Sequence, residues 1–237
     1  MNIEQLSKRL ETVVSYIPTG SKIADIGSDH AYLPCFAVRK GIADSAIAGE
    51  VVQGPFLSAE KQVKDASLED KIEVRLGNGL EVISPGEVDC IIIAGMGGAL
   101  IASILEDGKE KLEGVERLIL QPNVSAKSIR IWLIQNNWEL TNEEIIEEDG
   151  KVYEILTADR GEPLRPYHEE GHQKGLLLGP FLMQQKNEAF QKKWMQERAQ
   201  WKKILSNMEK AEQTGVLNER KVELMNKIQM VEEVLSN

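Results

Sequence analysis

Short apolar runs alternate with segments of helical spacing along the first two thirds of the chain. The apolar runs occupy residues 22–26, 45–51, 72–76, 88–94 and 117–121. The segments of helical spacing between them occupy residues 31–40, 55–67, 97–107 and 125–136. Because the strands of a buried parallel sheet read as continuous apolar runs, this alternation predicts βαβ units around a parallel sheet.

Two further patterns flank this sheet. Residues 3–16 carry apolar side chains at helical spacing, which predicts a helix before the first strand. Residues 143–158 form two strand-like runs around Asp149-Gly150. Asp-Gly favours a type I′ turn, in which both central residues need positive φ, so this segment predicts an antiparallel hairpin at the end of the sheet.

The pattern changes again after residue 160. Residues 161–180 are rich in Gly and Pro and predict a boundary, so we divide the chain into a domain at 1–160 and a C-terminal part at 161–237. Beyond the boundary, two sets of apolar residues recur near heptad spacing: Phe190, Trp194, Trp201, Ile204 and Met208, then Leu217, Leu224, Ile228, Val231 and Leu235. With Gln213-Thr214-Gly215 between them, they predict an antiparallel, coiled-coil-like helical hairpin.

Composition places the chain among ordinary globular proteins. Of its 237 residues, 42% are hydrophobic and 28% are charged. The longest run without a charged residue, 90–105, is shorter than the about 20 apolar residues that a membrane span needs. The N-terminus lacks the apolar core of a signal peptide, and Cys35 and Cys90 make no disulfide framework. We therefore expect a cytoplasmic protein with no membrane partner.

Charge is distributed unevenly along the chain. The formal net charge is −10, yet residues 1–160 carry 16 Lys and Arg against 27 Asp and Glu, and residues 161–237 carry 12 against 11. Six basic side chains gather between 186 and 203: Lys186, Lys192, Lys193, Arg198, Lys202 and Lys203. An acidic body with a basic appendage is suited to presenting nucleic acid to a site that does not itself attract phosphate. The alternative is a solvated helix face without a partner.

The residues that carry chemistry stand where the predicted strands end. In open parallel sheets, ligands bind beyond the carboxyl ends of the strands. The five strand ends read Asp25-Ile-Gly27-Ser-Asp29-His30, Glu50, Gly77-Asn78-Gly79, Gly95-Met96-Gly97-Gly98 and Gln121-Pro122-Asn123. Singly, a glycine here merely turns the chain and an Asp caps the next helix. Together, they predict one ligand site.

The first loop favours a cationic ligand. Glu50 lies 23 residues after Gly27, near the spacing at which an acidic side chain accepts hydrogen bonds from a ribose. A dinucleotide would place its pyrophosphate against bare backbone in this loop, where Asp29 instead brings a carboxylate. S-adenosylmethionine has a ribose, a sulfonium and an ammonium but no phosphate. The loop therefore favours S-adenosylmethionine over a nicotinamide cofactor.

Four stretches carry a family resemblance. DIGSDHAYLP, NGLEVI, IAGMGG and LILQPN, in this order and followed by a helical C-terminal segment, resemble the bacterial TrmK family of tRNA (adenine-22-N1)-methyltransferases. The resemblance implies a class I methyltransferase fold, with a seven-stranded, mostly parallel α/β sheet whose last strand is antiparallel, and a coiled-coil-like C-terminal domain. It also implies S-adenosylmethionine as the cofactor and tRNA as the substrate.

The resemblance also assigns roles to residues. It implies that Asp25, Gly27, Ser28, Asp29 and His30 hold the methionine part of the donor and that Glu50 holds the ribose. It implies that Asn78 and Gly79 lie by the adenine of the donor, and that Gly95 and Met96 line the donor and the target base. For tRNA, we expect contacts from the following residues: Lys8, Arg9, Asn123, Lys192, Lys193, Arg198 and Lys202.

A direct mechanism fits these residues. Strand four lacks the Asn/Asp-Pro-Pro-aromatic sequence of enzymes that methylate exocyclic adenine amines, which favours a ring nitrogen as the target. Adenine N1 has an in-plane lone pair, so catalysis rests on positioning, and Asp29 is our candidate for stabilising the positive charge that develops on the base. The alternative for Asp29 is a helix N-cap.

Two other functions stay open at the level of sequence. One is a methyltransferase that acts on a small molecule, and the other is a noncatalytic, nucleotide-dependent binding protein. We expect a monomer without a metal ion.

Overall fold

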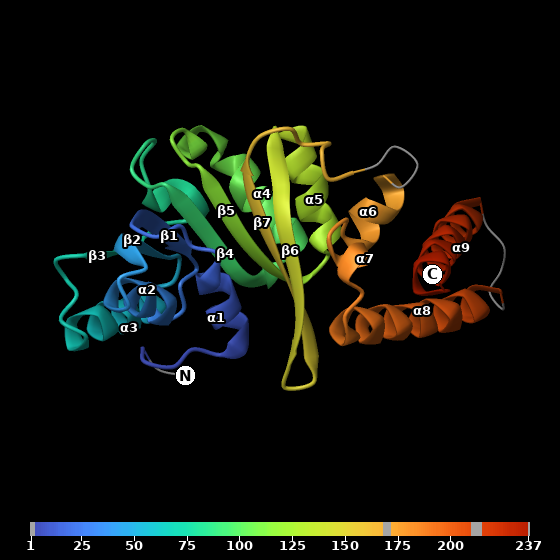
Figure 1. The fold of residues 1–237 in the computed structure, drawn as a ribbon, viewed down its shortest axis with the longest axis horizontal. Helices are drawn as coiled ribbons and strands as arrows, with labels where there is room; N and C mark the ends of the chain where they lie inside the picture. The colour runs from blue at the N-terminus through green and yellow to red at the C-terminus, as the bar shows by residue number, and fades with distance from the viewer. Residues whose placement is uncertain (1–2, 168–171, 210–214, 237) are drawn as a thin grey trace.

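The computed structural model describes residues 3–167, 172–209 and 215–236. Its centre is a seven-stranded sheet with the strand order β3-β2-β1-β4-β5-β7-β6 (Figure 1). The parallel strands are β1 (Ser21–Ile26), β2 (Ala43–Glu50), β3 (Ile72–Leu76), β4 (Cys90–Gly97) and β5 (Arg117–Val124). The predicted parallel sheet is therefore confirmed.

The predicted hairpin closes one edge of the sheet. β6 (Trp138–Glu148) pairs antiparallel with β7 (Lys151–Arg160), and β7 pairs antiparallel with β5. Asp149 and Gly150 both have positive φ, at 50° and 75°, as the type I′ turn predicts. The tip of this hairpin extends beyond the sheet (Figure 1).

Helices cover both faces of the sheet. α1 (Lys8–Ser15), α2 (Tyr32–Arg39) and α3 (Gln53–Asp65) pack on one face, and α4 (Gly98–Asp107) and α5 (Ala126–Gln135) pack on the other. Two short 3₁₀ helices, Gly79–Val82 and Lys109–Leu112, complete this part. Within β4, Cys90 and Ile92 contact the first helix layer and Ile91 and Ile93 the second, which explains the continuous apolar run.

The segment 161–180, in which the sequence placed a boundary, contains a helix. α6 (His172–Leu178) lies within it, and its buried Leu176, Leu177 and Leu178 pack against the body of the protein. Gly175 belongs to this packing, because a Cβ there would approach the Tyr167 ring to 2.9 Å. The glycines that suggested a loop thus permit close contact.

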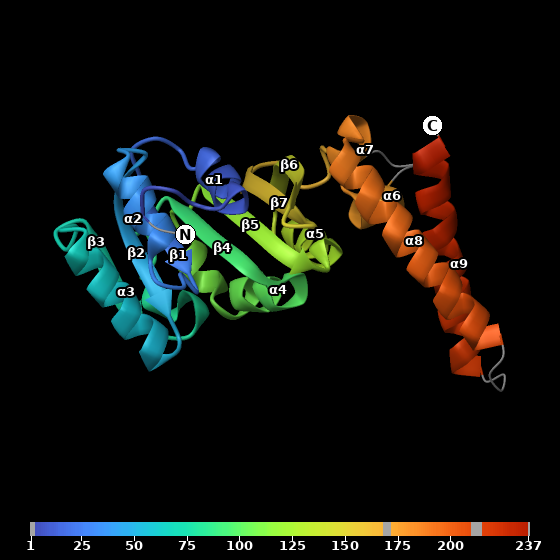
Figure 2. The same ribbon diagram turned by 90° about the horizontal axis from the view of Figure 1, so that it is seen from below.

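The C-terminal helices stand to one side of the sheet. α7 (Leu182–Gln185) leads into α8 (Glu188–Glu209), which runs alongside α9 (Gly215–Ser236) (Figures 1 and 2). Phe190, Trp194 and Val231 are buried in a cluster that also contains Ile145 of β6, whereas Ile204 is exposed. The predicted hairpin exists, and it packs on the sheet as well as on itself. Of the predicted turn, Gln213 and Thr214 lie outside the described residues.

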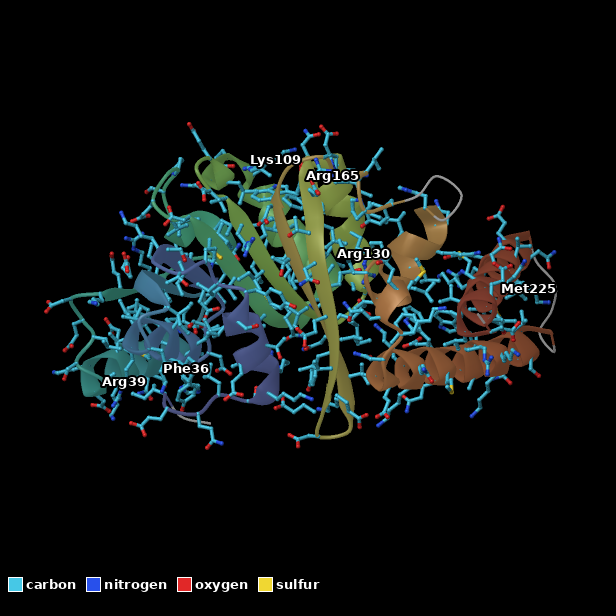
Figure 3. The ribbon with its side chains drawn as sticks, in the orientation of Figure 1. Phe36, Arg39, Lys109, Arg130, Arg165 and Met225 are labelled. Atoms are coloured by element: carbon cyan, nitrogen blue, oxygen red, sulfur yellow. The ribbon has the colours of Figure 1, made fainter. Side chains whose placement is uncertain are left out.

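A buried ion network joins these helices to the sheet. Arg130 of α5 is fully buried and donates to Glu143 of β6 and Glu154 of β7, each at 2.6 Å. Lys193 of α8 pairs with Glu154 from the other side. Figure 3 shows Arg130 between the sheet and the C-terminal helices.

Among the helices that the structure describes, none is long and apolar enough to cross a membrane.

Candidate active site

A cavity of about 350 Å³ opens at the carboxyl ends of β1, β4 and β5. Its lining comes from the first loop, from the ends of β4 and β5, and from α1, α2 and β7: Arg9, Leu10, Asp25, Gly27, Ser28, Asp29, Tyr32, Leu33, Ala94, Gly95, Met96, Asn123 and Tyr153. Three of the five predicted strand ends therefore meet in one site.

The first loop folds tightly against the ends of β2 and β4. Gly27 has φ +72°, and a Cβ there would meet Met96 Cε at 2.3 Å. The N–H groups of Gly27 and Ser28 both donate to the Gly49 carbonyl, at 2.9 and 3.2 Å. Glycine is favoured at this position because side chains rarely adopt its φ, and a Cβ would also require the end of the Met96 side chain to move.

The next turn of the loop is unusual in its backbone. Asp29, His30 and Ala31 all have positive φ, between 46° and 73°. The Asp29 N–H donates to Glu50 Oε1 at 2.6 Å, which ties the loop to the end of β2. Such left-handed runs in residues other than glycine cost free energy and cluster at functional sites. The strain therefore supports the loop as part of a binding site.

The alternative role for Asp29 as a helix N-cap is wrong. The N-cap of α2 is Ala31, and no side chain caps this helix. The Asp29 side chain is instead 79% exposed, lines the cavity and lies 3.5 Å from His30 Nε2. It is available to a ligand.

Asp25 and Glu50 are two buried carboxyl groups at the edge of this site. Asp25 accepts a 2.6 Å hydrogen bond from Ser28 Oγ. The pKa of Asp25 is raised to about 7, chiefly by burial; the Ser28 hydrogen bond lowers it, and the nearby Glu50 carboxylate contributes to the rise. Burial also raises the pKa of Glu50, although the hydrogen bond from the Asp29 N–H lowers it. A cationic group that entered the site would favour the ionised form of both.

Gln121 organises the opposite wall. This fully buried amide accepts hydrogen bonds from the Gly95 N–H, at 3.0 Å, and from the Arg9 guanidinium. Its Nε2 donates to the Pro122 carbonyl, and Asn123 Nδ2 donates to the Gly95 carbonyl at 2.7 Å. Gly95 has φ +82°. Gln121 thus fixes the backbone of the loop at the end of β4. It also holds the side chains of Arg9 and Asn123 in the cavity wall.

Sequence reasoning missed two functional features of this wall. The sequence analysis placed Gln121 at a strand end but gave it no role. That position at a strand end was the feature from which a role in the site could have been predicted. Sequence reasoning did not name Tyr153, whose ring lies 5.4 Å from the Arg9 guanidinium and lines the cavity. Tyr153 comes from the antiparallel hairpin, so no rule about parallel strand ends could find it.

Asn78 and Gly79 lie apart from the main cavity. They line a separate hollow of about 150 Å³ beside α4, with Ile104 and Asp107. Glu81 accepts from the Asn78 N–H at 3.0 Å, and a Cβ on Gly79 would touch Ile104 at 3.0 Å. Their contact with the adenine of a cofactor stays a prediction.

The predicted tRNA-contacting residues are dispersed. Arg9 and Asn123 line the cavity, and the Lys8 N–H donates to Glu148 at 2.5 Å. On α8, Lys192 pairs with Glu147, Lys193 with Glu154 and Lys202 with Glu232, which Arg198 also approaches. These ion pairs compensate much of the positive charge that the sequence suggested for this segment.

Comparisons with known proteins identify the family. A family model, TrmK: tRNA (adenine(22)-N(1))-methyltransferase, matches residues 23–233. The tRNA (adenine(22)-N(1))-methyltransferase of Bacillus subtilis (strain 168) is 51% identical over 237 residues, which cover 100% of both chains. The chain belongs to the TrmK family.

Solved structures of this family agree with the fold. The crystal structure of the B. subtilis m1A22 tRNA methyltransferase TrmK matches with a TM-score of 0.95 and 51% identity, over 98% of this chain and 99% of that one. A putative tRNA (m1A22) methyltransferase from Streptococcus pneumoniae, in complex with S-adenosyl-L-methionine, matches with a TM-score of 0.86 and 43% identity, over 98% and 100%. The predicted family, fold class and cofactor are thereby confirmed.

The residues present fit S-adenosylmethionine. The buried Asp25 and the exposed Asp29, which both line the cavity, offer negative charge to the sulfonium and ammonium. Among the described residues, no group of three or more His, Cys, Asp or Glu side chains is arranged to hold a metal ion.

Proposed function

We propose that this protein transfers a methyl group from S-adenosylmethionine to N1 of adenine 22 in tRNA, within the cavity described above. The single observation that supports this most strongly is the match to a tRNA (adenine(22)-N(1))-methyltransferase along the whole chain. The cavity adds a chemical reason, since its acidic first loop suits a cationic methyl donor.

The cofactor roles follow the geometry of the first loop. Asp25, held by Ser28 Oγ, is suited to the donor's ammonium, and the exposed Asp29 and His30 are suited to the rest of its methionine part. Glu50 uses one carboxylate oxygen on the Asp29 N–H, which leaves the other for the ribose hydroxyls. Gly95 and Met96 lie between this loop and Asn123, where donor and target base would meet.

Positioning accounts for much of the proposed catalysis. When bound, S-adenosylmethionine supplies an electrophilic methyl group. Adenine N1 is an adequate nucleophile at neutral pH, so the protein needs to hold it in line and exclude water. Methylation leaves a positive charge on the base, and Asp29 provides a carboxylate for that charge.

The target adenine has to leave any base pair before it reacts. Its N1 is occupied in Watson–Crick pairing, so entry into the cavity costs a few kcal/mol of stacking and pairing. We assign the tRNA-binding role to the C-terminal part, 161–237, together with Arg9 and Asn123. We further infer that the protein acts as a monomer in the cytoplasm.

The test is methyl transfer to two tRNA transcripts. Labelled S-adenosylmethionine is incubated with an unmodified transcript that has adenine at position 22 and with the same transcript carrying guanine there. We expect 1-methyladenosine in the first and none in the second. Label in neither transcript, with donor binding intact, would contradict the proposal and favour a small-molecule substrate. Label in both would contradict the choice of position.

A further inference from the structure

A second hollow lies directly beside the catalytic cavity. It has a volume of about 470 Å³ and shares Asn123 and Tyr153 with that cavity. Its walls are the end of β5, the tip and β7 side of the hairpin, and one side of α8. We call it the α8 groove and define it by Val124, Ser125, Lys151, Val152, Gln196 and Gln200. Because two residues line both hollows, the groove continues the catalytic cavity.

The α8 side of the groove is a single helix face. Lys193, Gln196, Glu197 and Gln200 stand at positions i, i+3, i+4 and i+7, which project to one side of a helix. Lys193 is already paired with Glu154. The exposed amides of Gln196 and Gln200 are the uncharged hydrogen-bonding groups of this face.

The groove has the chemistry of a nucleotide site. Amide side chains donate to and accept from base edges. Val124, at the end of β5, is 65% exposed and offers an apolar surface to the face of a base. Lys151, exposed at the hairpin tip, can reach a phosphate. With a volume of about 470 Å³, the groove has room for one nucleotide.

We propose that the α8 groove binds the nucleotide next to the methylated adenine in the tRNA strand, with Gln196 and Gln200 contacting its base and Lys151 its phosphate. The inference rests on the proposed function, because an adenine that enters the cavity brings its covalently attached neighbour to the adjoining hollow. Under this proposal, the side chains of α8 that meet the RNA are Gln196 and Gln200 rather than Lys192 and Lys202. Lys192 and Lys202 pair with carboxylates elsewhere, whereas the amide face borders the site.

The first test is the double variant Gln196→Ala/Gln200→Ala. Both residues are exposed on a helix, and alanine favours helix, so folding should be unaffected. Loss of two hydrogen bonds to the substrate should raise KM for tRNA about tenfold. We expect kcat within about twofold of the parent and an unchanged dissociation constant for S-adenosylmethionine, since neither residue lines the catalytic cavity.

The matched control is Gln191→Ala/Gln229→Ala. These are also exposed glutamines of α8 and α9, and neither lines the groove. The control should keep the parent KM. Equal KM values for the two double variants, in a protein that methylates tRNA, would overturn the inference while leaving the proposed function intact. If the parent protein itself does not methylate tRNA, the proposed function fails instead.

A crosslinking experiment locates the contact. A photoreactive benzoyl-phenylalanine replaces Gln200, and irradiation with the tRNA transcript is followed by mapping of the crosslinked nucleotide. We expect a crosslink to the nucleotide immediately 5′ or 3′ of the target adenine. A crosslink confined to nucleotides distant from that adenine would overturn the inference, as would the absence of any crosslink under conditions where the variant still methylates.

Discussion

At the scale of single residues, the site keeps Asp25 where an ionised carboxylate is unfavourable. Asp25 is buried at the end of β1, and that burial raises its pKa from 3.8 to about 7. Between these two values the folded protein binds more protons than the unfolded chain does. Stability therefore falls as pH rises through this window, and above about pH 7 the ligand-free fold carries the full cost of the buried charge.

Replacing Asp25 by Asn should separate stability from binding. The variant removes the buried charge and still offers an oxygen to Ser28 Oγ. At pH 8 we expect it to be more stable than the parent by roughly 2–4 kcal/mol, since one pKa unit is worth about 1.4 kcal/mol. Its affinity for S-adenosylmethionine should fall at least about tenfold, because a charge-assisted hydrogen bond is lost. Denaturant unfolding at pH 5 and pH 8, with calorimetric titration of the donor, measures both effects.

The same carboxyl group makes donor binding dependent on pH. A cationic ligand prefers the ionised form of Asp25, and half of that form is lost near pH 7. We expect the affinity of the parent protein for S-adenosylmethionine to weaken about tenfold from pH 8 to pH 6, with proton release on binding. The Asn variant should lose this dependence. A flat pH profile in the parent would contradict the assignment of Asp25 to the donor.

Asp29 should act on turnover more than on donor affinity. Asp29→Asn is the sharper variant, because Asn tolerates the φ of 46° at this position better than Ala does. Without the carboxylate, we expect the single-turnover rate to fall about tenfold, less than for a fully buried group because the side chain is largely exposed. The donor dissociation constant should change less than about threefold. Equal losses in both quantities would make Asp29 a cofactor ligand only.

At the scale of elements, the sequence predicted the parallel strands, the hairpin and the terminal helices because each carries its own local pattern. The strand ends also revealed Asp25, Asp29, Gly95 and Asn123, which line one cavity. Sequence could not reveal α6, because it lies in a segment rich in Gly and Pro, or Tyr153, which reaches the cavity through an antiparallel pairing. It also overestimated the free charge of α8, because the partners of its lysines lie on distant strands.

The ion network between α5, β6, β7 and α8 shows most clearly how carboxylates on distant strands neutralise a lysine of α8. Arg130 faces two buried carboxyl groups. Burial raises the pKa of Glu143 in spite of Arg130. Burial opposes the charge of Glu154 as well, but Lys193 and Arg130 together lower its pKa. Lys193 therefore supplies the second positive charge that this pair of carboxylates needs.

Lys193→Met should destabilise the protein by about 2 kcal/mol. The substitution leaves an uncompensated buried charge, which costs less here than in a closed core because Lys193 is partly exposed. Thermal unfolding should report a decrease in Tm of roughly 6 °C. The matched control is Lys192→Met, whose surface pair with Glu147 should contribute less than about 1 kcal/mol. Adding Glu154→Gln to Lys193→Met should restore most of the loss, and equal effects of the two lysine variants would refute this account.

At the scale of the whole molecule, the C-terminal helices complete the core of the domain that carries the cavity. Ile145 of β6 packs among Leu178, Phe190 and Val231, and Arg130 donates to the carbonyl groups of Leu176 and Leu177. A chain that ended at residue 160 would expose this apolar strand face together with Glu143 and Glu154. The division at 160 that composition suggested therefore separates parts that stabilise each other.

We accordingly expect one cooperative unfolding transition for the full chain. Two autonomous domains would give two transitions, or a calorimetric enthalpy larger than the van't Hoff enthalpy, whereas a shared core gives equal enthalpies. Residues 1–160 alone should aggregate or unfold at least about 10 °C below the full chain, because they lose several fully buried contacts. A fragment that kept the Tm and donor affinity of the full chain would show instead that the helices are an independent appendage. Since β7 contributes both Glu154 to the network and Tyr153 to the cavity, the cooperative result would mean that the helices also fix one wall of the active site.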